Sequence, residues 1–181
     1  MAYAEIVAPP AEPLALSDLK AHLRLEGEEE DAVLARLIKA ARQHLEQETG
    51  LCLITRRWRL YLDRWPGPCL IQISKGPVQT LEAMTVYDAA GAPQELDSSL
   101  YALDKGGRLE GPSPGGGPLE IDFTAGFGLT GDDVPEPLRQ AMLLHAGQLY
   151  EYRGQVPLAL AVAAVPAGYD RLVGPWRRVK L

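Results

Sequence analysis

The segment from Val134 to Arg153, VPEPLRQAMLLHAGQLYEYR, places the strongest constraint on the fold of this chain. Asp132 and Asp133 are candidates for its N-cap, and the prolines at its start fit a first helical turn, where a missing N–H costs nothing. Gly154 can end the helix. At about 100° per residue, six residues form one buried stripe: Leu138, Ala141, Met142, His145, Leu149 and Tyr152.

Two further large residues, Leu143 and Tyr150, fall on nearly the opposite side of this helix. A helix at a protein surface needs only one apolar stripe. We therefore predict that the helix is covered twice. Its own domain provides one cover, and either another part of the chain or a neighbouring subunit provides the second.

Residues 17–49 are predicted to form two further helices, with a break at Gly27 and an end at Gly50. The acidic run over 28–31 suits the positive end of the second helix dipole, which favours a structural role for these carboxylates over metal binding. The second helix is apolar on one side only, through Val33, Leu34, Leu37, Ile38, Ala41 and Leu45.

After Gly50 the apolar period changes from 3.6 to 2, which is typical of half-buried strands. Trp58, Leu60 and Leu62 alternate with polar residues. Further short strands are predicted near 70–73, 81–87, 101–109 and 119–123, and the residues 104–107, Asp-Lys-Gly-Gly, are predicted to form a hairpin turn within 101–109. Helices and strands are thus segregated along the chain, which predicts an α+β fold with an antiparallel sheet.

We expect three parts. An extended arm covers residues 1–15 and is either free or packed on a neighbour. A main domain covers 16–153, with helices over 17–49 and 134–153 and a β-rich part over 54–125. A C-terminal tail covers 154–181, and because it is apolar and then aromatic and basic, we expect it to dock on its own domain or on a partner.

The charge balance argues against a general nucleic-acid binder. The chain has 18 basic and 24 acidic residues and a net charge of −6, whereas such a binder carries a basic face. The one candidate patch is the cluster of Arg56, Arg57 and Arg59 beside Trp58, and a solvated strand face explains it more simply. The longest apolar run, 156–165, is about half of what a bilayer span requires, so no membrane association is predicted.

No catalytic, cofactor-binding or metal-binding pattern is present. The histidines at 22, 44 and 145 have no metal-ligand spacing, the glycine loops lack the residues of a phosphate site, and no GxSxG is found. His145 is interpreted as a core histidine. The alternative is a small enzyme or ligand-binding domain with a site near His145 and Tyr150, which would require an open pocket lined by both residues. We therefore predict a protein that is not an enzyme and has no cofactor.

Several segments together resemble the head–tail connector (adaptor) proteins of long-tailed bacteriophages and gene transfer agents. No single motif is specific, but their order and spacing are. They are Leu16–Arg24, Asp31, Leu34, Ile38–Arg42, Glu46, Gly50, Trp58, Gly76–Val78, Tyr101, Thr124–Gly128, Val134–Pro135, Leu138, Ala141, Leu149–Arg153, Tyr169, Leu172 and Pro175–Arg177. The acidic segment 26–31 and the alanine-rich segment 158–165 depart from the family pattern.

The resemblance implies a helical bundle with a β-rich part and a structural role in the neck of a phage-like particle assembled in the bacterial cytoplasm. In the family, subunits form a ring, usually of twelve, beneath the portal protein. The ring extends the DNA channel, through which DNA passes without specific binding, and offers a platform for the next neck protein. A ring needs heterologous contacts, in which different patches of two copies meet.

On this interpretation, the second side of the long helix provides a subunit interface, through Leu143, Tyr150 and Arg153. The tail provides the portal-binding residues Trp176, Arg177 and Arg178.

Overall fold

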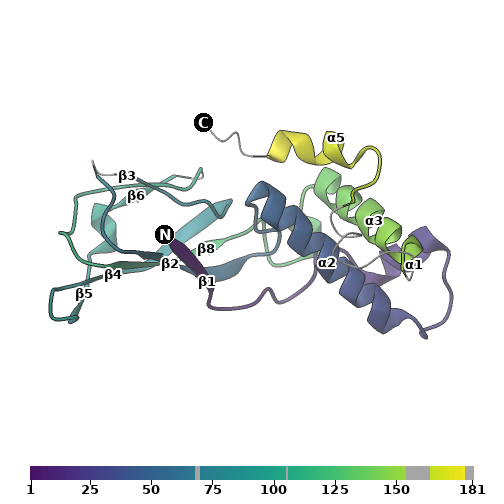
Figure 1. The fold of residues 1–181 in the computed structure, drawn as a ribbon, viewed down its shortest axis with the longest axis horizontal. Helices are drawn as coiled ribbons and strands as arrows, with labels where there is room; N and C mark the ends of the chain where they lie inside the picture. The colour runs from purple at the N-terminus through teal and green to yellow at the C-terminus, as the bar shows by residue number, and fades with distance from the viewer. Residues whose placement is uncertain (68–69, 105, 154–163, 178–181) are drawn as a thin grey trace. The chain divides into compact units, whose positions relative to one another are not determined.

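The structure, a computed structural model, describes residues 1–67, 70–104, 106–153 and 164–177. The chain folds into two compact units. The sheet unit consists of Met1–Pro10 and Thr55–Phe127, and the helical unit consists of Ala11–Ile54 and Gly128–Leu181. Helices and antiparallel sheets are therefore segregated, and the predicted α+β class is confirmed (Figure 1).

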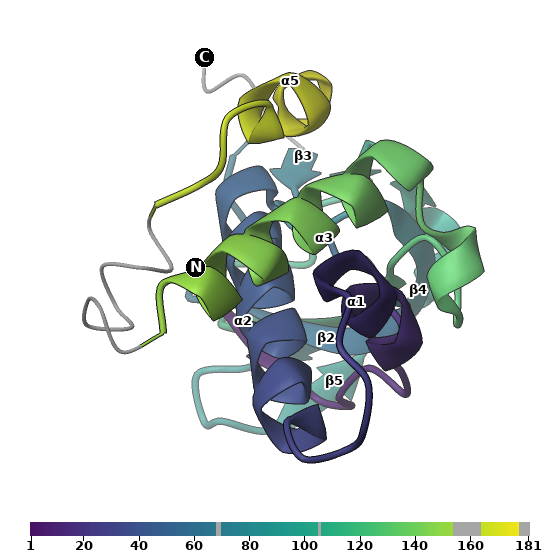
Figure 2. The same cartoon turned by 90° about the vertical axis from the view of Figure 1, so that its right-hand side faces the viewer.

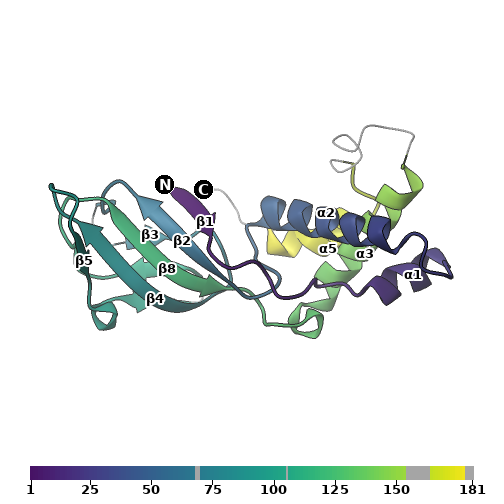
Figure 3. The ribbon, with the colours of Figure 1, turned by 90° about the horizontal axis from the view of Figure 1, so that it is seen from below.

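The sheet unit contains a five-stranded antiparallel sheet with the order β1-β2-β8-β4-β5 (Figure 3). The bounds of its strands are β1 (Ala2–Glu5), β2 (Arg56–Leu62), β4 (Val78–Tyr87), β5 (Pro93–Glu95) and β8 (Leu119–Ala125). The alternation predicted for β2 is confirmed, because Trp58, Leu60 and Leu62 are buried while Tyr61 is exposed. Leu60 lies opposite Ile121 of β8, and both are fully buried.

A second, three-stranded sheet has the order β3-β7-β6, with β3 (Leu70–Gln72), β6 (Ala102–Leu103) and β7 (Arg108–Glu110). The hairpin of β6 and β7 was predicted from the sequence, and Leu103 pairs with Leu109 in it. A short 3₁₀ helix, η1 (Ser98–Leu100), precedes β6. Ile71 and Leu109 provide fully buried side chains in this sheet.

Residues 2–5 lie in the segment expected as an extended arm, and they form β1. Ala4 pairs with Arg59, and the Tyr3 hydroxyl accepts a hydrogen bond from the backbone N–H of Ser74 at 2.8 Å. Later in the same segment, Glu12 belongs to the helical unit, where its carboxylate accepts a hydrogen bond from Arg42 Nε at 2.7 Å. The first 15 residues thus contribute to both units.

The helical unit contains α1 (Leu16–Leu23), α2 (Asp31–Thr49), α3 (Glu136–Glu151) and α5 (Tyr169–Val173), together with the 3₁₀ helices η2 (Gly131–Asp133) and η3 (Gly174–Trp176). Helix α3 contacts α1, α2 and α5 (Figure 2). Helix α2 buries Leu34, Leu37, Ile38, Ala41 and Leu45, which was the apolar side predicted from the sequence. It ends at Gly50, which adopts the left-handed conformation expected there.

Two details of α3 differ from the sequence prediction. The helix begins at Glu136 with Pro135 in the N-cap position, because Asp133 instead forms a capping box with Thr130 in η2. Tyr152 was placed on the buried stripe, and this was wrong: α3 ends at Glu151, so Tyr152 leaves the helical stripe and is 39% exposed.

A buried ion network stabilises α2. Arg42 and Glu46 are one helical turn apart, with Nη1 and Oε2 separated by 2.9 Å, and their side chains are 5% and 6% exposed. Glu46 Oε1 also accepts a hydrogen bond from the backbone N–H of Leu53 at 2.9 Å. The network therefore fixes the chain on both sides of the C-terminal turn of α2.

Candidate functional site

Helix α3 is covered from more than one side, as its sequence predicts. Leu138, Ala141, Met142, His145 and Leu149 are buried. Helix α5, from the C-terminal segment, also contacts α3. Because Tyr169 of α5 lies beside His145, α5 covers this first stripe, whereas cover on the opposite side comes from α1. Part of the second cover therefore comes from the chain itself, which was one of the two alternatives left open by the sequence.

Gly147 lies on the opposite side of α3 and is also buried, because α1 passes close to it. A Cβ at this position would lie 3.2 Å from Cδ2 and Nε2 of His22 and 3.9 Å from Leu23. The missing side chain thus permits the close approach of the two helices. The amphipathic stripe alone does not reveal this contact.

His145 is fully buried in a cluster of aromatic rings. Its ring centroid lies 4.9 Å from that of His44 and 5.6 Å from that of Tyr169, in edge-on arrangements. Burial raises the pKa of the Tyr169 hydroxyl. Because His145 has no exposed surface, it cannot line an open pocket with Tyr150, and the alternative of an enzyme or ligand site beside these two residues lacks its required geometry.

Two of the predicted interface residues, Tyr150 and Arg153, lie together beside Glu30. The Tyr150 hydroxyl donates a hydrogen bond to the Glu30 carboxylate, and Arg153 Nη1 lies 2.7 Å from Glu30 Oε1. The Arg153 guanidinium lies over the Tyr150 ring, 3.9 Å from its centroid. The hydrogen bond from Tyr150 and then that from Arg153 lower the pKa of Glu30.

This cluster has an apolar base and an exposed rim. Tyr150 packs beside the buried pair Leu37 and Leu149, while the Arg153 side chain is 46% exposed. Leu143, the third predicted interface residue, is half-buried. Glu30 was not predicted as part of this group, since it precedes Tyr150 by 120 residues and no local pattern connects them.

The C-terminal segment docks on the helical unit. Tyr169 and Val173 of α5 are fully buried, and Gln148 Nε2 of α3 donates a hydrogen bond to the carbonyl of Ala164 at 2.9 Å. Of the predicted portal-binding residues, Trp176 is half-buried, and Arg177 forms ion pairs with Glu48 of α2 and Asp170 of α5. Arg178 lies outside the described residues.

The arginine cluster of β2 is neutralised by carboxylates. Arg56 is buried and lies 3.5 Å from Glu5, and Arg57 lies 3.0 Å from Asp122. Arg59 lies 2.6 Å from Asp122 and 3.0 Å from Glu120. Arg59 is the main cause of the lowered pKa of Asp122. All three arginines therefore have carboxylate partners, unlike the cations of the basic stripe of a nucleic-acid binder.

Comparison with known proteins identifies the family. Residues 14–98 match the family described as "Phage gp6-like head-tail connector protein". The whole chain, at 33% identity, is similar to "Neck of empty GTA particle computed with C6 symmetry", with a TM-score of 0.84. It is also similar, again at 33% identity, to "Virion of native gene transfer agent (GTA) particle" and "Neck of native GTA particle computed with C12 symmetry", each with a TM-score of 0.81. Each comparison covers 100% of this chain and 97% of the other.

The chain belongs to the phage gp6-like head–tail connector family. It is a structural connector of a phage-like particle, and its place is in the neck. The resemblance drawn from the sequence is confirmed. A search of curated proteins finds no match to this connector.

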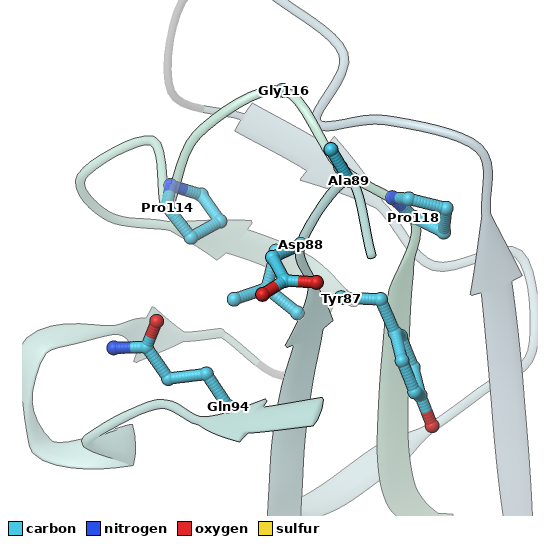
Figure 4. A pocket seen from close by; sticks show the side chains of 9 residues that line it. Tyr87, Asp88, Ala89, Gln94, Pro114, Gly116 and Pro118 are labelled. Carbon is cyan, nitrogen blue, oxygen red and sulfur yellow. The ribbon is translucent and has the colours of Figure 1, made fainter. Parts of the chain in front are cut away.

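The connector has a surface pocket of about 450 Å³ in its sheet unit, between the end of β4, β5 and the glycine-rich loop before β8 (Figure 4). Tyr87, Pro114 and Pro118 are among its lining residues. Asp88, also at the pocket, is occupied by its own turn, because Oδ1 accepts hydrogen bonds from the backbone N–H groups of Ala90 and Ala92 at 2.8 and 2.9 Å. The pocket is therefore a space where the turn after β4 meets the glycine-rich loop.

The described part of the connector has neither a metal-binding cluster nor a membrane-spanning helix. Across residues 1–67, 70–104, 106–153 and 164–177, no group of three or more histidine, cysteine, aspartate or glutamate side chains could hold a metal ion. Within the same part of the chain, no helix has the length and apolar character needed to cross a bilayer.

Proposed function

We propose that this connector assembles into a ring in the neck, beneath the portal protein, where it extends the DNA channel and links the capsid to the tail. The observation that carries this proposal is the full-length similarity, at 33% identity, to proteins of gene transfer agent necks computed with C6 and C12 symmetry. Both symmetries are compatible with a ring of twelve copies. We propose that number for this chain.

A channel through which DNA moves must not bind DNA tightly, because each phosphate contact adds affinity. The net charge of −6 and the neutralised arginines of β2 support this role. DNA would therefore pass the ring without specific binding. The next neck protein would attach to the side of the ring away from the portal.

We propose that Leu143, Tyr150 and Arg153 contribute to the contact between subunits. Leu143 is half-buried within a single copy and therefore keeps apolar surface that a neighbour could cover. Arg153 is held by Glu30 and Tyr150 and still exposes almost half of its side chain. A side chain that is fixed and exposed loses little conformational entropy on binding.

We propose that the chain end from Trp176 through Arg178 contacts the portal. Arg177 is already paired with Glu48, so its role would be to hold the segment on the connector. Trp176 and Arg178 would then reach the portal. Removal of residues 154–181 is a poor test of this role, because it would also remove the fully buried Tyr169 and Val173.

The experiment is electron microscopy of the purified connector mixed with the portal protein of the same particle. A symmetric collar on the portal is the expected result, and portals without a collar would contradict the proposal. Arg178→Glu should reduce the number of collars, while the matched variant Arg171→Glu, which reverses an exposed charge of α5, should not. Equal loss in both variants would argue against a specific role of Arg178.

A further inference from the structure

The solvent-facing side of α2 carries positive charge only. Glu48 is exposed but lies on another side of the helix, where it pairs with Arg177. At about 100° per residue, the remaining exposed residues of α2 lie in one arc. They are Ala32, Ala35, Arg36, Lys39, Gln43 and Gln47. Neither Arg36 nor Lys39 has an ion pair among the described residues, and Arg36 Nε donates to the backbone carbonyl of Ala32 at 3.2 Å. The alanines would allow close approach of another surface to this face.

The loop between α1 and α2 carries the opposite charge. Glu26, Glu28 and Glu29 are exposed, and no ion pair of theirs is found within the part of the chain that the structure describes. The two carboxylates that follow are already occupied, since Glu30 binds Tyr150 and Arg153, and Asp31 lies 2.7 Å from Lys20. Three glutamates of the loop therefore remain available for a partner.

We propose that the acidic loop of one subunit docks on the solvent-facing side of α2 in the next copy around the ring. This inference rests on the ring proposed above. A ring requires contact between two different patches, and these patches differ in element and in charge. A two-fold contact between the same patches would pair them twice and close at two copies, whereas a heterologous contact uses each patch once and continues around a ring.

A charge-swap experiment tests this contact. One variant makes the helix face acidic, with Arg36→Glu and Lys39→Glu. A second makes the loop basic, with Glu26→Lys, Glu28→Lys and Glu29→Lys. All five residues are exposed, so both variants should fold, which circular dichroism checks. Each variant alone should give about tenfold fewer collars on portals than the original chain.

Mixing the two variants provides the decisive measurement. In an alternating ring, the acidic loop of the first variant meets the unchanged basic helix of the second, and the basic loop of the second meets the acidic helix of the first. An equimolar mixture should therefore restore collars that contain both chains in equal amounts. A variant with Arg64→Glu and Arg108→Glu controls for the change in net charge, since both residues are exposed in the sheet unit. It should assemble normally.

The outcomes separate this inference from the ring itself. If the original chain forms no collar, the proposed function fails. If the original chain forms collars and both swapped variants also do so alone, the ring stands and the loop-to-helix contact is wrong. The contact is also wrong if the helix variant still forms collars but loses a salt-dependent binding of DNA that the original chain shows. The α2 face would then bind DNA phosphates and not a neighbouring subunit.

Discussion

Arg42 and Glu46 form a buried ion pair within α2, and Glu12 lies on the other side of the same guanidinium. Burial alone would lower the pKa of Arg42, but its carboxylate partners raise it above its ordinary value. The pair is therefore an integrated part of the core of the helical unit. Loss of Glu46 would leave Glu12 as the remaining carboxylate partner of a buried guanidinium.

We expect Glu46→Ala to destabilise the connector by about 1–3 kcal/mol, because the buried Arg42 would lose one of its two carboxylate partners and the backbone N–H of Leu53 would lose its acceptor. The measurement is urea unfolding followed by circular dichroism. Gln47→Ala, at the exposed neighbouring position, should change the free energy of unfolding by less than about 0.5 kcal/mol. Similar losses in the two variants would show that the network contributes little.

Tyr169→Ala should weaken the helical unit by about 3–5 kcal/mol, since it removes a fully buried ring that contacts His44 and His145. Protection of the α5 amides against hydrogen exchange should fall as well. Tyr152→Ala removes a tyrosine that is 39% exposed and serves as the control. If Tyr169→Ala unfolds at the same urea concentration as the original chain, α5 does not contribute to the core in solution.

The pairing of Asp122 with Arg59 and Arg57 predicts a pH dependence. The arginines lower the pKa of Asp122 in the folded state, so its contribution to stability is present above the pKa of the unfolded chain, about 3.9. That contribution is lost as the pH falls through the lower pKa of the folded state. Asp122→Asn should therefore be less stable than the original chain at pH 7, and the difference should shrink below about pH 4. A difference that stays constant between pH 7 and pH 3 would contradict the assignment.

Gly147→Ala tests the approach of α1 to α3. Alanine in place of glycine normally favours a helix by about 1 kcal/mol, but here the new methyl group would press on the ring of His22. We expect a smaller gain or a loss in the original chain. The full gain should appear when His22→Ala is also present. Thermal unfolding of the four chains of this double-mutant cycle gives the coupling energy, and a coupling of zero would mean that the two residues do not touch.

The local features of the fold could be predicted from the sequence. The period of α2, the alternation of β2 and the turn before β7 are each set by residues close together in the chain. The contacts of the candidate site could not be predicted in this way. Glu30 with Tyr150, Glu48 with Arg177 and Gly147 with His22 join residues that are far apart in sequence. Each of these contacts depends on tertiary packing and leaves no local pattern.

Charge patterns were predictive only in part. The interpretation of the β2 arginines as a solvated face is correct for Arg57 and Arg59, which are partly exposed, and wrong for Arg56, which is buried beside Glu5. The alternation of the strand does place Arg56 on the inward side with Trp58. Its carboxylate partner comes from β1, and the sequence had suggested an arm there. Because residues 2–5 were predicted as an extended arm and not as a strand, the carboxylate that allows Arg56 to be buried could not be identified from the sequence.

Strand β1 comes from the first few residues of the chain, while its neighbour β2 comes more than 50 residues later. A purification tag fused directly to Met1, or a start site moved past Glu5, would disturb or remove this outermost strand. The backbone N–H and C=O groups of β2 would then face water along an open edge, and open edges recruit other strands. Protein with an altered N-terminus would therefore be prone to aggregate through its sheet. An unmodified N-terminus is the safer choice for assembly experiments.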